Sequence, residues 1–176
     1  MVAMKEATEA VTDKLVIHGD SRWPSHRDSL QSQRGLKGRS GSACHMAKSP
    51  SGLSCHWGAL LLLHDESLAE HGGTAGLRDE RLLNSVLARP LNLAACGEPD
   101  FADLAAAYGS GLAQNHAFVD GRKRVAFLAV GLFLRVNGYR LNASQAEATL
   151  TMLSLAAGEL EEATFAAWIR ARGEKR

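Results

Sequence analysis

Residues 115–136 read NHAFVDGRKRVAFLAVGLFLRV, a short polar stretch that runs directly into the most apolar segment of the chain. From Arg122 to Val136 the sequence is apolar on almost all sides of a helix, and Asn137-Gly138 after it is a typical helix stop. A helix that is hydrophobic all round belongs in a protein interior. We therefore expect a buried central helix whose first turn carries the polar residues.

Apolar residues recur at helical spacing elsewhere after residue 57, and each segment ends at a stop signal. Gly109 and Gly111 weaken one of these helices but allow close packing. The predicted helices are 59–71, ended by Gly72-Gly73; 79–89, ended by Pro90; 101 to about 115, capped by Asp100; 122–136; Ser144, with a capping box to Glu147, to about 157; and about 161–172. This predicts an all-α bundle of about six helices with almost no sheet, and a short hairpin or flap at 90–99.

The first predicted helix places Leu60, Leu63, Ser67 and Leu68 on its inner side. The cluster His64-Asp65-Glu66 is interpreted as a solvated helix face.

Composition limits the function classes. The chain has 176 residues, 45% hydrophobic and 22% charged, which suits one domain of ordinary size. Its apolar runs, 59–63 among them, are far shorter than the roughly 20 residues that span a bilayer. Three cysteines are too few for a disulfide framework. These features predict a soluble cytoplasmic protein with no membrane partner.

Charge divides the chain into two parts. Residues 1–57 carry 8 Lys+Arg against 5 Asp+Glu, whereas residues 58–176 carry 12 against 14. The net negative body disfavours direct nucleic-acid binding. We expect residues 58–173 to form the domain and residues 1–57 to be a tail, with disorder over 20–54 and at most a short helix over 5–17.

The tail contains a repeated Cys-His pair, Cys44-His45 and Cys55-His56. Four such side chains are potential zinc ligands, but their spacing differs from the usual patterns in which two ligands share a tight turn. A start at Met46, or a shifted reading frame, also explains the unusual tail.

The polar stretch before the central helix predicts an anion site. Backbone N–H groups at a helix start attract anions, and Gly121 allows a phosphate to approach the backbone closely. Lys123 and Arg124 add two positive charges, Arg124 as a bidentate fork. Together these residues are typical of a polyphosphate site.

The residues just before Gly121 add chemical groups to that site. Asp120 offers one hard carboxylate ligand to a Mg²⁺ ion that bridges phosphate oxygens. His116 has a near-neutral reference pKa and can accept a proton from an attacking hydroxyl. Phe118, between them, would anchor the loop to the core. Taken singly, each residue has an ordinary structural reading, as a solvated histidine or a solvated basic run.

The order of these residues resembles the signature of the Fic fold, HxFx(D/E)GN(G/K)R, in the Lys-containing form typical of the death-on-curing (Doc) toxins. The resemblance continues in Leu63-His64-Asp65, in Glu70 to Gly73, in Leu77-Arg78-Asp79 through Arg89-Pro90 and in residues 127–141. It covers about residues 59–172.

The resemblance implies transfer from a nucleotide to a protein hydroxyl. Most Fic proteins transfer AMP, whereas Doc toxins are kinases that pass the terminal phosphate of ATP to a threonine of elongation factor Tu. By motif position, His116 would be the general base and Asp120 the Mg²⁺ ligand. Gly121 would belong to the phosphate nest, with Lys123 and Arg124 as phosphate clamps. The 90–99 stretch matches the family's target-aligning flap.

Two positions depart from the family pattern. Arg122 replaces the Asn of GNKR, where it either adds a phosphate contact or crowds the nest. Ala117 replaces a frequent Pro, which only relaxes the loop backbone.

The self-inhibitory pattern [S/T]xxxE[G/N] is absent, because no Glu in the chain precedes Gly or Asn. The resemblance therefore implies a separate Phd-like antitoxin that blocks the site. Three hypotheses follow: a Doc-like kinase of a type II toxin-antitoxin system, an AMP transferase, or an antitoxin-binding protein impaired by Arg122.

Overall fold

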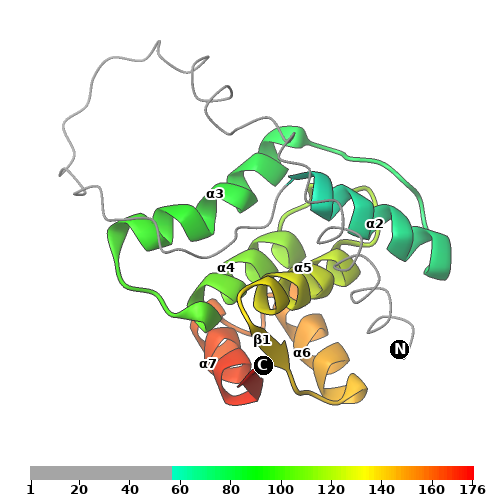
Figure 1. The fold of residues 1–176 in the computed structure, drawn as a ribbon. Coiled ribbons are helices and arrows are strands. Elements are labelled where there is room, and N and C mark those ends of the chain that lie inside the picture. Colours follow the sequence, from blue (N-terminus) through cyan, green and yellow to red (C-terminus); the bar gives the residue numbers. More distant parts are fainter. Residues whose placement is uncertain (1–56) are drawn as a thin grey trace, which may run out of the picture.

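The computed structural model describes residues 57–176, which form six helices and one small sheet (Figure 1). The helices are α2 (Trp57–His71), α3 (Glu80–Cys96), α4 (Phe101–Gln114), α5 (Arg122–Val136), α6 (Gln145–Ala157) and α7 (Glu162–Arg172). Strands β1 (Tyr139–Leu141) and β2 (Gly173–Lys175) pair antiparallel, with Arg140 opposite Glu174. The expected all-α bundle is confirmed.

Several expectations concern residues before this part of the chain. The helix at 5–17, the disorder at 20–54 and the two Cys-His pairs lie outside the described residues and stay predictions. Within residues 57–176, no helix is both long enough and apolar enough to cross a membrane.

Helices α4 and α5 form the centre of the bundle, with the other helices packed around them (Figure 1). Every residue from Ala105 to Ala113 of α4 is buried, and so is most of α5, as expected. The two glycines of α4 do permit close packing. A Cβ on Gly109 would lie 2.7 Å from the Phe165 ring, and one on Gly111 would lie 2.8 Å from Val86 Cγ1.

The expected end of the second helix at Pro90 is wrong, because α3 continues to Cys96. A proline inside a helix loses one hydrogen bond and crowds the preceding turn. Pro90 lies on the same helical face as Leu83 and Val86, and all three are buried. Contact with the core therefore offsets the local cost. The expected hairpin or flap at 90–99 is also wrong, because α3 includes most of that stretch.

An extended segment lies instead between α2 and α3, alongside the loop that precedes α5. Leu77 and Phe118 form an antiparallel bridge. The Arg78 N–H donates to the Ala117 carbonyl at 2.7 Å, and the Val119 N–H donates to the Gly76 carbonyl at 3.1 Å. Backbone pairing thus fixes the path of the loop that holds the candidate site.

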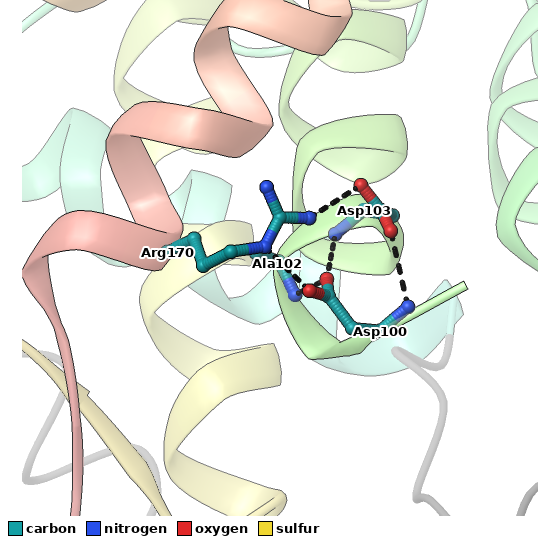
Figure 2. A network of polar contacts seen from close by, with 4 residues as sticks. All are labelled: Asp100, Ala102, Asp103 and Arg170. Carbon is teal, nitrogen blue, oxygen red and sulfur yellow. Dashed lines mark hydrogen bonds and ion pairs between the residues drawn. The ribbon is translucent and has the colours of Figure 1, made fainter.

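A polar junction fastens α7 to the start of α4 (Figure 2). Asp100 caps α4 as expected, in a reciprocal capping box with Asp103. Arg170 donates from Nε to Asp100 Oδ2 at 2.5 Å and from Nη2 to Asp103 Oδ1 at 2.8 Å. The hydrogen bond from Arg170 lowers the pKa of Asp100 to about 2, against the opposing effect of burial.

The Asp100→Asn variant tests the charged part of this junction, because Asn is an equally good N-cap but carries no charge. Since the folded-state pKa of Asp100 lies below its ordinary value, its ionised form stabilises the fold above about pH 4. That contribution disappears as the pH falls towards 2. After solvent screening we expect a loss of about 1 kcal/mol at pH 7. Urea unfolding should show the difference in full at pH 7 and only a small part of it at pH 2.5, which lies close to the folded-state pKa of Asp100.

The Gly109→Ala variant tests the close packing of α4. Alanine favours a helix by about 1 kcal/mol, but the added methyl group meets the buried Phe165 ring and Val130. We expect a net loss of about 1–2 kcal/mol in the free energy of unfolding. Gly97→Ala is the matched control, because its nearest contact is 3.8 Å away. Equal stability of the two variants would contradict the close approach.

Candidate active site

The loop from Asn115 to Gly121 joins α4 to α5, as the sequence predicts. Ala117 and Phe118 are buried, at 1% and 2% exposure, while His116 and Asp120 are exposed. The apolar side chains thus hold the loop in the core, and the two polar groups face outward next to the first turn of α5.

Gly121 is the N-cap residue of α5 and adopts a left-handed conformation, with φ 76° and ψ 5°. This conformation strongly favours glycine. Because glycine has no side chain, the first N–H groups of α5 have no side-chain cap. Uncapped N–H groups at a helix start form a ready site for an anion.

Asp120 is exposed, and its side chain folds back on its own backbone. Its Oδ1 accepts the Gly121 N–H at 2.6 Å. This bond, followed by one from the Thr74 N–H, lowers the pKa of Asp120 below its ordinary value. The carboxylate is therefore ionised at neutral pH. Among residues 57–176, no group of three or more His, Cys, Asp or Glu side chains is placed to hold a metal ion. Asp120 fits a Mg²⁺ ion whose other ligands are phosphate oxygens and water.

Arg124 forms hydrogen bonds with backbone carbonyls near the end of α2. Its Nη2 donates to the Gly72 carbonyl at 2.9 Å and its Nη1 to the Ser67 carbonyl at 3.3 Å, so the guanidinium joins α5 to the end of α2. A Cβ on Gly121 would still lie 3.5 Å from Arg124 Nη2. The guanidinium is thus beside the helix start as well. Lys123 is exposed one residue earlier.

Arg122 lies against His116. One nitrogen of its guanidinium, Nη1, is 2.8 Å from Nδ1 and 3.0 Å from Nε2 of the imidazole. The two ring nitrogens point in different directions, so a single nitrogen this close to both covers the ring instead of forming two in-plane hydrogen bonds. Arg122, the residue that departs from the family pattern, therefore covers the imidazole ring of His116, the expected general base.

A cavity of about 210 Å³ opens beside the first turn of α5. Its walls are mainly apolar and include Phe127 of α5 and Met152 and Leu153 of α6. Lys123 and Arg124 also line it. The sequence analysis did not identify this cavity, because it depends on how α6 packs. An apolar pocket with cations beside it suits a flat organic group joined to an anion.

His64 was also missed as a site residue. The expected solvated face is correct for Asp65, whose side chain is 70% exposed, but wrong for His64, which is 2% exposed. His64 falls four residues after Leu60 and three before Ser67, on the inner side of α2. That spacing is the signal that could have placed it. Its Nε2 lies 3.0 Å from the Asp120 carbonyl oxygen.

Comparisons with known proteins find related chains. A model of the Fic/DOC family matches residues 58–134. The chain is 43% identical over 74 residues to Toxin Doc of Mycolicibacterium smegmatis, an overlap of 41% of this chain and 57% of that protein. It is 32% identical over 112 residues to Protein kinase doc of Escherichia phage P1, or 63% of this chain and 88% of that protein. The chain thus spans little more than half the length of the first relative and most of the second.

Proposed function

Because the chain belongs to the Fic/DOC family, we propose that it is a Doc-type toxin of a type II toxin-antitoxin system. As a protein kinase it transfers the terminal phosphate of ATP to a hydroxyl of a translation factor such as elongation factor Tu. The observation that carries this proposal is the loop before α5, which presents an imidazole and an ionised carboxylate and leads into an uncapped helix start. The names of both relatives support the proposal.

The proposed reaction is an in-line displacement at phosphorus. The target hydroxyl oxygen forms a bond to the γ-phosphorus of ATP, the bond from that phosphorus to the β–γ bridging oxygen breaks, and ADP leaves. His116 receives the hydroxyl proton on a ring nitrogen. Bound Mg²⁺ would neutralise phosphate charge. Asp120 would hold it, and the N–H groups at the start of α5 would bind the phosphate oxygens.

Transfer of AMP is the second candidate, because most Fic proteins perform it and the same loop would serve it. The attacked atom would then be the α-phosphorus, and pyrophosphate would leave. Lys123 favours the kinase, since this position distinguishes the Doc form of the motif.

The proposal includes an antitoxin of the Phd kind that covers the site. Leu150 and Leu153 of α6 are 65% and 44% exposed, and Leu153 also lines the cavity beside Lys123. An exposed apolar surface at a basic site supports docking of a partner segment with apolar and acidic side chains.

The His116→Ala and Asp120→Ala variants test the proposed function. Full-length protein, Mg-ATP and elongation factor Tu are incubated with either γ- or α-labelled ATP. We expect γ-label on the target with wild type and a loss of at least about 100-fold in either variant. His71→Ala and Glu98→Ala are matched controls, because both residues are exposed and outside the loop. Label from α-ATP instead would identify an AMP transferase.

The Arg122→Asn variant tests the contact between Arg122 and His116. The shorter side chain withdraws the guanidinium from the imidazole ring. We expect the transfer rate, or the growth arrest after induced expression, to rise about 10-fold or more. Arg81→Asn is the control for loss of one exposed charge. A fall in activity would mean that Arg122 binds phosphate. An inactive wild type revived by Arg122→Asn would identify the chain as an impaired, antitoxin-binding form.

A further inference from the structure

His64 of α2 contacts the backbone of the candidate site at Asp120. The proposed reaction assigns it no role. Its side chain is 2% exposed. The imidazole stacks on the Phe118 ring with the centroids 4.4 Å apart and the planes at 25°. The imidazole therefore packs between helix α2 and the loop that carries His116 and Asp120.

The hydrogen bond of His64 determines where its proton lies. The partner of Nε2 is the Asp120 carbonyl oxygen at 3.0 Å, and a carbonyl oxygen can only accept. Nε2 must therefore carry the proton. On the other side of the ring, Nδ1 lies 3.6 Å from the exposed Asp65 carboxylate.

The peptide unit between Asp120 and Gly121 is thus bound at both ends. Its carbonyl accepts from His64, and its N–H donates to Asp120 Oδ1 at 2.6 Å. A peptide unit is planar, so these two bonds together fix its rotation. The imidazole also lies close beneath Gly121, since a Cβ there would be 3.6 Å from His64 Nε2. Rotation of this unit would turn the Gly121 N–H and the Asp120 carboxylate away from their present positions.

From this geometry we infer that His64 is a positioning residue for the phosphate site. It holds the peptide unit that orients both the carboxylate of Asp120 and the first turn of α5. The inference rests on the proposed nucleotide-dependent transfer, and it concerns the orientation of the site, not the chemistry of the reacting atoms. Groups that orient metal ligands from behind typically affect metal affinity or activity by about 10-fold to 100-fold.

Two substitutions separate the hydrogen bond from the packing. His64→Phe keeps a ring against Phe118 but has no donor, whereas His64→Gln keeps an amide N–H near the position of Nε2. We expect His64→Phe to raise the KM for Mg-ATP about 10-fold while the KM for the protein target changes less than about 2-fold. His64→Gln should restore the KM for Mg-ATP to within about 3-fold of wild type. A purely structural role would lower the amount of active protein and leave both KM values unchanged, which would overturn the inference.

A second measurement needs no nucleotide or target. In the ¹⁵N NMR spectrum of the full chain, His64 should show the tautomer protonated at Nε2, and the Gly121 amide signal should shift in His64→Phe but return towards wild type in His64→Gln. Protonation at Nδ1 alone, or an unshifted Gly121 amide in His64→Phe, would overturn the inference. A wild-type protein without transfer activity would contradict the proposed function, and these spectra would still decide the role of His64.

Discussion

The guanidinium of Arg124 connects the end of α2 to the start of α5, and the candidate site depends on this connection. Arg124 donates to the carbonyls of Ser67 and Gly72, at the C-terminal end of α2. The guanidinium thus lies at the negative end of one helix. Gly73 completes the contact, because a Cβ there would lie 2.7 Å from Asp120 Oδ2 and 2.8 Å from Leu68 Cδ2. The Gly-Gly pair therefore ends α2 and also leaves room for the carboxylate of the site.

Three kinds of contact hold the loop from Asn115 to Gly121. Its own Phe118 inserts into the core, the extended segment at Gly76 and Arg78 pairs with its backbone, and His64 binds the Asp120 carbonyl. Its polar groups His116 and Asp120 are left exposed. A rigid loop with exposed polar groups suits phosphoryl transfer, in which catalysis depends mainly on positioning and charge.

The sequence predicted the helices well because their signals are local. Asp100, Ser144 and Gly72-Gly73 mark ends that depend on neighbouring residues alone, and the apolar character of residues 122–136 required burial. Pro90 misled the prediction because its cost is local, whereas the compensating burial comes from the rest of the fold. The cavity between α5 and α6 depends on tertiary packing, which no motif encodes. His64 is followed by Asp65 and Glu66, so this stretch of sequence indicates a solvated helix face. The helical spacing of His64 from Leu60 and Ser67 nevertheless places it on the buried side of α2.

The contacts of the three basic residues at the start of α5 change how the motif is interpreted. From sequence alone they formed one cluster of positive charge for phosphate. In the structure Arg124 already donates to two carbonyls at the end of α2, and Arg122 covers the imidazole of His116. Lys123 is the one of the three whose side chain is exposed. An incoming triphosphate would therefore meet mainly the N–H groups of α5 and Lys123, with Arg124 adding charge from a fixed position. Arg124 can keep its bonds to α2 while it does so, because a guanidinium has five N–H donors. Arg122 likewise has N–H donors besides the Nη1 group that contacts His116, so the position of this one side chain decides how far the base is covered.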